Sequence, residues 1–391
     1  MKNIYKNKKE CSICSKRSLE NLIKLNKFPL TGIFIKDKLK KNFPYFFNQG
    51  LNICINCGHL QLSKFISPDL LYNNIYANRT TESYLSDNAI NFFKNFLFQV
   101  LKKKRMEVFL EIGCNDIKLI NSLKNFFVHL YGIDPIWKKK KVPKSSQVTV
   151  IGDFIEKINF KKIKKKINVI ASTHNLEHID NPYRILKKFV DKYDENTIFF
   201  IEVPDANLMI KNLRFDQIFH QHYHYFNIYS LKNLINMLGC KIIAKDINYK
   251  FWGGSLVVAF KKDKNIKNKI NNQYKKLKPK INQKYKKFKE HYKKLSKKFN
   301  SKKNLIGYGA GQMVPSFAYH LNSDLSFLKV IVDDNKKRNK KKYPFLFPDI
   351  KFFDKKLLDN IILITALDGV SGITKKLKKL KVEFYNPLSK I

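Results

Sequence analysis

The stretch Leu110-Glu111-Ile112-Gly113-Cys114-Asn115-Asp116 leaves an apolar run and enters a glycine turn. About twenty residues later a second apolar run ends on a carboxylate, in Gly132-Ile133-Asp134-Pro135. This pairing is typical of an open α/β sheet that binds a nucleotide, because glycine lets the backbone approach the ligand and the carboxylate accepts hydrogen bonds from ribose hydroxyls. The pattern is shorter than the full dinucleotide fingerprint, so the segments around it decide its interpretation.

Apolar runs alternate with helical patterns on both sides of this stretch. They occupy residues 108–112, 128–133, 148–151, 169–172, 198–203, 241–244 and 256–260. Strands that alternate with helices predict an α/β fold with a largely parallel, doubly wound, Rossmann-like sheet covered on both faces. A second glycine turn, Gly307-Tyr308-Gly309-Ala310-Gly311, with apolar runs at 330–334 and 361–365, predicts a second small Rossmann-like domain.

Three domains are expected along the chain: a cysteine-containing module over 1–75, the first α/β domain over 76–262, and a helical linker with the second α/β domain over 263–391. The linker carries apolar residues at steps of three and four, which predict an amphipathic helix packed on a neighbouring domain. Pro279 is expected to kink this helix or to divide it. The stripe consists of Ile266, Ile270, Tyr274, Leu277, Ile281, Tyr285, Phe288, Tyr292, Leu295 and Phe299.

The formal net charge is +46, which suggests nucleic acid as a partner. However, only six of the 77 basic residues are Arg, the side chain suited to bidentate contacts with bases and phosphates, and the lysines are spread over the whole chain. A coding bias toward Lys, Asn, Ile, Phe and Tyr explains this composition better, so no nucleic-acid partner is expected. No apolar run is long enough to span a membrane and the first residues do not form a secretory signal, which predicts a cytoplasmic protein.

Four of the six cysteines form two pairs, Cys11-x-x-Cys14 and Cys54-x-x-Cys57. Each pair can place two thiolates on one ion, and four sulfurs complete a tetrahedral, structural zinc site. Disulfides and unrelated free thiols are the alternatives, and a reducing cytosol disfavours the first. His59 is a spare candidate ligand. Cys114 and Cys240 are expected to be small buried residues rather than nucleophiles.

Histidines cluster in Phe219-His220-Gln221-His222-Tyr223-His224. They could bind a metal, but no carboxylate or cysteine lies near them in the sequence to complete a ligand set. A single general base, with the other histidines structural, is the preferred interpretation, because a neutral imidazole accepts protons near pH 7. His174-Asn175-Leu176-Glu177-His178 follows a predicted strand, at the sheet edge where ligands bind, and its histidines could contact the cofactor or cap the next helix.

Taken in order, these motifs resemble the S-adenosylmethionine-dependent sugar C-methyltransferases, whose members methylate nucleotide-linked deoxysugars. The resemblance covers nearly the whole chain. It rests on the four cysteines, the first glycine turn, the segment 174–182, the histidine segment 218–222, Trp252-Gly253-Gly254-Ser255 and the terminal Gly-Tyr-Gly-Ala domain with Asp333-Asp334-Asn335. It implies S-adenosylmethionine and structural zinc as cofactors and a nucleotide-linked sugar as substrate, with no membrane partner; the oligomeric state stays open.

The resemblance also implies roles for individual residues. Catalysis would involve His222 as the base, with Gln221, His220 and Tyr76 beside it. The cofactor would contact Glu111, Gly113, Asn115, Asp134, Asp153, Asn175, Leu176 and His178, with Asp134 on the ribose hydroxyls and Asp153 on the adenine amine. In the implied chemistry, a ketone acidifies the neighbouring C–H, the base removes that proton, and the resulting enolate attacks the sulfonium methyl.

This chain departs from the family pattern at several positions. Phe219 and Gln221 stand where the family has Tyr and Glu, so a hydroxyl and a carboxylate are missing. Ile117 replaces the glycine that ends the cofactor turn, where a β-branched residue disfavours positive φ. Asn78-Arg79 replaces paired serines. These differences leave open another acceptor atom or a binding protein without turnover, and the basic charge leaves open an RNA methyltransferase.

Overall fold

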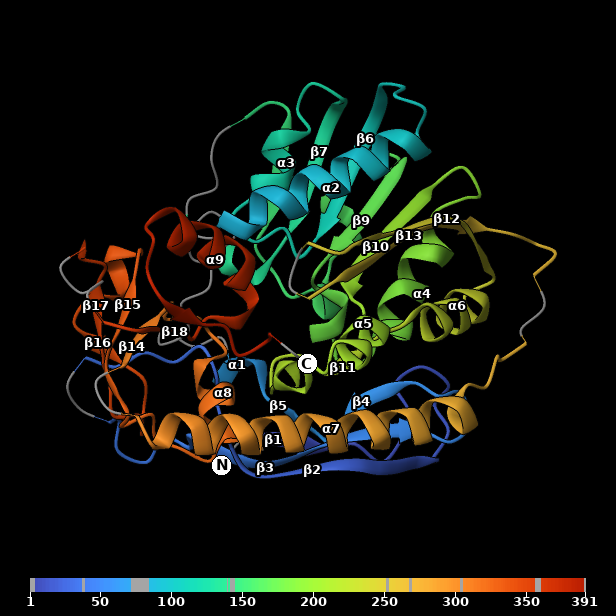
Figure 1. Ribbon diagram of the computed structural model, residues 1–391. Coiled ribbons are helices and arrows are strands. Elements are labelled where there is room, and N and C mark those ends of the chain that lie inside the picture. Colours follow the sequence, from blue (N-terminus) through green and yellow to red (C-terminus); the bar gives the residue numbers. More distant parts are fainter. Residues whose placement is uncertain are drawn as a thin grey trace.

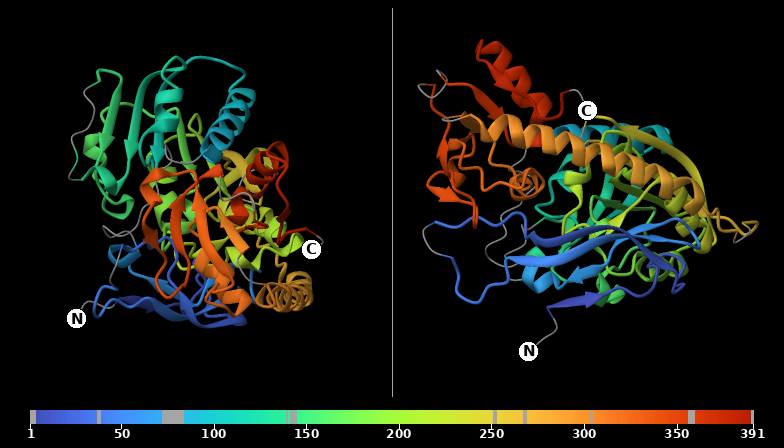
Figure 2. Two further views of the ribbon diagram at one scale, coloured as in Figure 1. Left: turned by 60° about the vertical axis from the view of Figure 1, so that its left-hand side comes forward. Right: turned by 60° about the horizontal axis from the view of Figure 1, so that its bottom comes forward.

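The computed structural model describes residues 4–36, 39–71, 84–138, 140, 145–250, 253–266, 269–302, 305–355 and 360–389. Three larger sheets occupy separate regions of the molecule, and the long helix α7 (Tyr274–Asn300) runs beside the N-terminal sheet toward the C-terminal sheet (Figure 1). The two views in Figure 2 show the same arrangement, with the C-terminal segment against the central domain rather than extended from it.

The central sheet has the order β12-β13-β10-β9-β6-β7-β8. Strands β8, β7, β6, β9 and β10 are parallel, and β13 is inserted antiparallel between β10 and β12. The chain reverses direction across the sheet between β6 and β9, which is where ligands bind in doubly wound folds. The strands are β6 (Met106–Ile112), β7 (Phe127–Ile133), β8 (Val148–Ile151), β9 (Val169–Thr173), β10 (Ile198–Pro204), β12 (Cys240–Asn248) and β13 (Ser255–Lys262).

Helices cover both faces of this sheet because the strands are apolar on both faces. Phe109 of β6 joins the core under α2 and α3, whereas its neighbours Val108 and Leu110 join the core under α4 and α6. Successive residues of a strand point to opposite faces, so one apolar run supplies two cores. The helices of this domain are α2 (Tyr84–Val100), α3 (Lys118–Ser122), α4 (Pro182–Lys192), α5 (Ala206–Lys211) and α6 (Ile228–Met237).

The N-terminal sheet contains a strand from the central part of the chain. Its order is β11-β4-β3-β2, and β11 (His224–Tyr225) pairs with β4 so that His224 lies opposite Gln61. The histidine segment therefore ends in an edge strand of the N-terminal sheet. The other elements here are β2 (Leu19–Pro29), β3 (Phe46–Cys54), β4 (Leu60–Leu62), the pair β1 (Tyr5–Asn7) and β5 (Lys64–Ile66), and α1 (Pro68–Leu71).

The C-terminal sheet confirms the second Rossmann-like domain. Its order is β16-β17-β15-β14-β18-β19, and all neighbouring pairs are parallel except β16 with β17. The glycine turn follows the central strand β14, as the sequence predicts. The elements are β14 (Leu305–Tyr308), α8 (Val314–Leu321), β15 (Leu328–Asp333), β16 (Lys341–Lys342), β17 (Asp349–Phe352), β18 (Ile362–Ile364), α9 (Val370–Lys379) and β19 (Phe384–Tyr385).

Helix α7 is one continuous helix, and the expectation that Pro279 divides it is wrong. It also begins at Tyr274, so Ile266 and Ile270 precede it. Leu277 and Ile281, one on each side of the proline, are both buried, and their burial holds the helix across the missing N–H.

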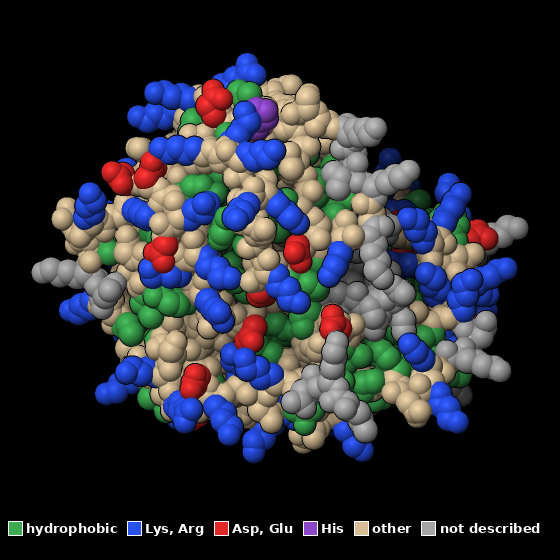
Figure 3. Space-filling view, turned by 180° about the vertical axis from the view of Figure 1, so that it is seen from behind, with side chains coloured by type: hydrophobic (Ala, Val, Ile, Leu, Met, Phe, Trp, Pro, Cys, Tyr) green, Lys and Arg blue, Asp and Glu red, His purple; other side chains and the backbone are tan. Residues whose placement is uncertain are grey.

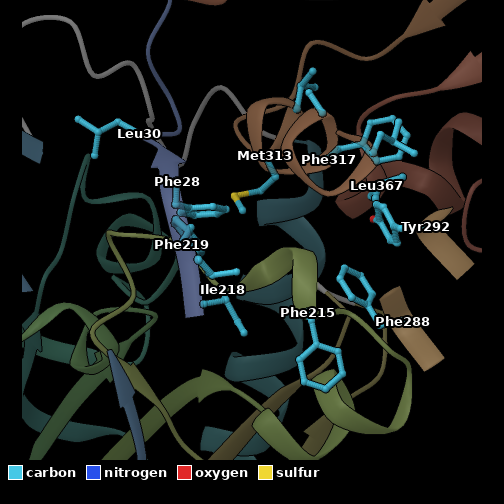
Figure 4. Packing of buried hydrophobic residues seen from close by; sticks show 14 of the residues in the cluster. Phe28, Leu30, Phe215, Ile218, Phe219, Phe288, Tyr292, Met313, Phe317 and Leu367 are labelled. Carbon is cyan, nitrogen blue, oxygen red and sulfur yellow. The ribbon is translucent and has the colours of Figure 1, made fainter. Parts of the chain in front are cut away.

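One hydrophobic core joins the three regions. It takes Phe28 from β2, Phe219 from the histidine segment, Phe288 from α7 and Phe317 from α8. Figure 4 shows Phe28 next to Phe219 and Met313, with Phe215, Phe288 and Tyr292 on the far side of the same cluster. How the chain divides into folding units stays a prediction, because this core crosses both of the proposed boundaries.

The surface in Figure 3 carries lysines and arginines over the whole visible face without a single dense patch. Among the described residues, no helix is both long and apolar enough to cross a membrane.

Replacing Pro279 with Ala should raise the free energy of unfolding by about 1–2 kcal/mol. Alanine restores a hydrogen bond inside the helix, and the greater freedom of the unfolded chain offsets part of that gain. Urea denaturation followed by circular dichroism measures the change. The neighbouring exposed Lys280→Ala variant, the matched control, should change it by less than about 0.5 kcal/mol. Equal stability of wild type and Pro279→Ala would contradict this account.

Candidate active site

The glycine turn after β6 is closed by a side chain from a second loop. Gly113 has a φ of +79°, and a Cβ added there would lie 2.4 Å from Cγ of Asn175. Only glycine therefore allows the Asn175 amide to lie directly over the turn. The two segments that the sequence assigned to the cofactor are thus in contact at the carboxyl edge of the sheet.

Asp134 at the end of β7 ties this turn to the next one. One carboxylate oxygen accepts a hydrogen bond from the backbone N–H of Asn115 at 2.9 Å, and the other accepts from that of Ile136 at 2.9 Å. The indole of Trp137 donates to the carbonyl of Asn115 at 2.6 Å. The carboxylate that would bind ribose hydroxyls is thereby held in place by backbone donors.

Asp153, after β8, lies next to this region. A Cβ on Gly152 would come within 2.5 Å of the backbone of Trp137, so the turns after β7 and β8 are packed together. The Asp153 carboxylate accepts from the N–H of Phe154 at 2.9 Å. Its placement is compatible with a contact to an adenine amine, and that role stays a prediction.

Glu111 is a buried carboxyl group at the end of β6. Its Oε1 accepts from the Thr173 hydroxyl at 3.1 Å. Burial raises its pKa to about 8, an effect that the Thr173 hydrogen bond opposes and the charge of Asp134 reinforces. Among the described residues, Glu111 Oε2 and Asn115 Oδ1 are buried acceptors without a hydrogen-bond partner. Such acceptors fit a ligand that brings hydroxyl and ammonium donors, as S-adenosylmethionine does.

Ile117 adopts the left-handed conformation that the sequence marked as unfavourable, with a φ of 58°. Its side chain is only 5% exposed and packs in the core under α2 and α3. Left-handed backbone costs about 1–2 kcal/mol, whereas burial of an isoleucine contributes about 1.5–3 kcal/mol. Burial therefore explains how the turn tolerates isoleucine.

Three histidines converge on Glu177, a residue that the sequence analysis did not assign to the site. Glu177 Oε1 lies 3.9 Å from Nε2 of His222, 3.9 Å from Nε2 of His178 and 3.8 Å from Nδ1 of His174. The expectation that no carboxylate accompanies the histidines fails, because it considered only sequence neighbours. The signal was present in the segment 174–178, which the sequence already placed at the sheet edge.

The histidines of this cluster have opposite protonation tendencies. Burial, together with the nearby His178 and His174, lowers the pKa of His222 well below its usual value, so its imidazole is neutral. Burial also lowers the pKa of His174, but the carboxylates of Glu202 and Glu177 outweigh burial and raise that pKa to about 10. A neutral His222 can accept a proton.

His220 and Gln221 point away from His222, into the N-terminal region. His220 Nδ1 lies 3.1 Å from Nε2 of Gln49, and its Nε2 lies 3.2 Å from the carbonyl of Phe28. The Gln221 amide exchanges hydrogen bonds with Thr31, accepting from its hydroxyl at 3.1 Å and donating to its carbonyl at 2.9 Å. These contacts join two regions of the protein, and a catalytic role for either side chain stays a prediction.

Of the other predicted residues, Leu176 lies in the hydrophobic core and His178 lies against His222. Leu176 is 1% exposed and packs in the core beneath the cofactor turn. The rings of His178 and His222 are in edge-to-face contact, with centroids 4.8 Å apart. Tyr76 and Trp252 lie outside the described residues.

The four paired cysteines form one buried cluster. Cys11 Sγ lies 3.6 Å from Cys57 Sγ, and Cys14 Sγ lies 3.6 Å from Cys54 Sγ. Disulfide sulfurs are about 2.05 Å apart, whereas sulfurs at the corners of a tetrahedron around zinc, each about 2.3 Å from the metal, are about 3.8 Å apart. All four sulfurs lie within 4.8 Å of one another, so they fit a structural zinc ion. His59 instead directs Nε2 toward Nδ1 of His224 at 3.1 Å.

Comparisons with known proteins match two parts of the chain. A methyltransferase domain model matches residues 82–245, and a zinc binding domain model matches residues 11–72. The chain therefore contains a methyltransferase domain and a zinc binding domain. Its resemblance to the C-methyltransferase family is confirmed by a match to the C-methyltransferase NovU of Streptomyces niveus, with 23% identity over 278 residues. That match covers 66% of this methyltransferase and 62% of the relative, less than two thirds of its length.

Solved methyltransferase structures also resemble this methyltransferase. The N-methyltransferase NodS of Bradyrhizobium japonicum, in complex with S-adenosylhomocysteine, is 10% identical over 46% of this chain and 88% of its own, with a TM-score of 0.35. The magnesium protoporphyrin IX methyltransferase of Synechocystis, with bound S-adenosylhomocysteine, is 12% identical over 49% and 91%, with a TM-score of 0.36. Likenesses of this size add no argument to the strand order already described.

Replacing Glu111 with Gln should stabilise the cofactor-free protein at high pH but not at low pH. The usual pKa of a glutamate is 4.5 and that of folded Glu111 is about 8. Between these values the folded state holds a proton that the unfolded state releases, so wild-type stability falls as pH rises. From pH 5 to pH 9 the stability of the variant relative to wild type should increase by about 2–4 kcal/mol.

Urea denaturation at the two pH values measures this difference. Glu107→Gln is the matched control, because Glu107 lies on the same strand and is exposed. A stability difference for Glu111→Gln that does not depend on pH would contradict the raised pKa.

Proposed function

We propose that this methyltransferase C-methylates a nucleotide-activated keto-deoxysugar and that His222 is the base. The observation that carries the proposal is a neutral, buried imidazole at the same sheet edge as the cofactor turn. His222 contacts the ring of His178, and His178 lies in the short segment whose Asn175 covers Gly113. His222 is therefore linked to the cofactor turn through the segment that carries His178 and Asn175.

Different residues of the chain would serve donor binding and proton transfer. Glu111, Asn115 and Asp134 would hold the donor at the strand ends, while His222 Nε2 would take the proton from the carbon next to the ketone. Bound S-adenosylmethionine would supply the activated methyl group for the carbanion that this proton removal creates. Alignment of these two groups and deprotonation account for most of the required catalysis.

The departures from the family pattern bear on the acceptor. Phe219 contacts His222, with ring centroids 4.2 Å apart, so an apolar ring stands where the family has a phenol. A developing oxyanion would therefore need a hydrogen-bond donor from another residue. The second candidate function is a methyltransferase of the same architecture that acts on a different acceptor atom.

Methyl transfer should be tested with the zinc-loaded protein, methyl-labelled S-adenosylmethionine and a panel of keto-deoxysugar nucleotides. Mass spectrometry detects the methyl gain and NMR locates the new bond, which separates carbon from oxygen or nitrogen acceptors. Without the methyl donor, the same sugar should exchange its acidic C–H with deuterated water, because His222 acts before the transfer. Absence of methyl gain on every keto-sugar tested would refute the proposal.

His222→Ala should lower the transfer rate by about 10²–10⁴-fold and abolish the deuterium exchange, while calorimetry shows unchanged donor binding. Asp134→Ala should weaken donor binding by about 1–2 kcal/mol. His129→Ala, on β7 away from the strand's carboxyl end, is the control and should retain activity. Full activity of His222→Ala would remove this residue from the base role.

A further inference from the structure

Glu177 presents a buried carboxylate to imidazole nitrogens without forming hydrogen bonds to them. The side chain is 1% exposed, and among the described residues neither of its oxygens has a hydrogen-bond partner. An unpaired buried carboxylate is strongly unfavourable unless another group compensates its charge. His174 lies 3.8 Å from Glu177 Oε1 but is shared with Glu202, so a further positive group that reaches both Glu177 and the imidazoles facing it would complete the compensation.

The spacing of these atoms is that of ligands sharing one ion. Hydrogen bonds between nitrogen and oxygen span about 2.7–3.2 Å, whereas ligands about 2.0–2.2 Å from a tetrahedral metal are about 3.3–3.6 Å from each other. The nitrogens of His178 and His222 lie 3.9 Å from Glu177 Oε1, and the donor atoms of all three residues lie within 4.8 Å of one another. The two nitrogen-to-oxygen distances exceed this ligand spacing by about 0.3–0.6 Å, so the imidazoles would move closer to Glu177 around a shared ion.

The surroundings orient the ligands as metal sites do. His178 Nδ1 donates to the carbonyl of Gln221 at 2.7 Å, which leaves Nε2 with its lone pair toward Glu177. A ligand histidine characteristically donates its other ring N–H to a carbonyl or carboxylate in this way. His174, beside the same Glu177 oxygen, is held by Glu202 at 3.4 Å, and Glu202 in turn accepts from the Ser255 hydroxyl at 2.6 Å.

We propose that Glu177, His178 and His222 bind a divalent transition-metal ion at a second metal site, separate from the four cysteines. Two imidazoles and one carboxylate suit zinc, cobalt, nickel or iron(II) rather than calcium or magnesium, which prefer oxygen ligands. Three protein ligands leave at least one coordination position open to solvent or substrate.

Occupation of this site has a consequence for catalysis that rests on the proposed function. A metal ion would take the lone pair of His222 Nε2, the same pair that accepts the substrate proton. The ion would therefore inhibit transfer by competing with deprotonation, and chelation would restore activity.

The test is a titration of the zinc-loaded protein with cobalt(II). Wild type should bind one equivalent beyond the zinc held by the cysteines, and the added cobalt should lack sulfur-to-metal charge-transfer absorption, because its ligands are nitrogen and oxygen. His222→Ala and Glu177→Gln should each lose that equivalent, whereas His129→Ala should keep it. Donor binding measured by calorimetry shows that each variant is folded.

Two results would overturn the metal site: no additional equivalent in wild type, or an additional equivalent that persists in both His222→Ala and Glu177→Gln. If either variant fails to bind the donor, its circular dichroism spectrum shows whether it is folded. The outcome is independent of the proposed function, since cobalt can bind at this site whether or not a keto-sugar is methylated. If cobalt does not slow methyl transfer, only the proposed inhibition is wrong, and the metal site is unaffected.

Discussion

The pairing of the two-residue strand β11 with β4 is the constraint on which the candidate site depends. It attaches the histidine segment to the N-terminal sheet, with His224 opposite Gln61. Every residue from 213 to 227 is buried, although little of that stretch is regular structure. A buried loop must satisfy its backbone polar groups, and the N-terminal region supplies partners such as the Leu62 N–H, which donates to the carbonyl of Tyr223 at 2.9 Å.

The four-cysteine cluster stabilises the sheet in which this pairing occurs. Cys54 ends β3 and Cys57 precedes β4, so the ion holds the turn between two strands of the sheet that carries β11. The same cysteines pack in one core with Phe226 and α6 of the central domain. A small module that could not fold on its own core is thereby stabilised by metal and by its neighbour together. Zinc held by these cysteines would therefore help to position the histidine segment, which carries the proposed base.

The cofactor turn, in contrast, contains features that lower the stability of the folded protein and are expected to favour ligand binding. Ile117 takes a positive φ, and Glu111 keeps a carboxyl group buried. Such strain is tolerated where the surrounding structure fixes it, and it persists at sites that bind ligands. A donor that brings positive charge and hydroxyl groups would relieve part of this cost, which links the instability of the cofactor-free turn to its affinity.

Local patterns in the sequence determined the α/β class, both glycine turns, the four-cysteine site and the place of Asp134, because strand periodicity and turn chemistry act over a few residues. The tertiary structure alone decided which side chains meet. Glu177 joins His222 from 45 residues away, His220 and Gln221 turn toward the N-terminal sheet, and Pro279 stays within one helix. These outcomes depend on packing between segments distant in the chain, where burial outweighs local preference, and no short-range pattern encodes them.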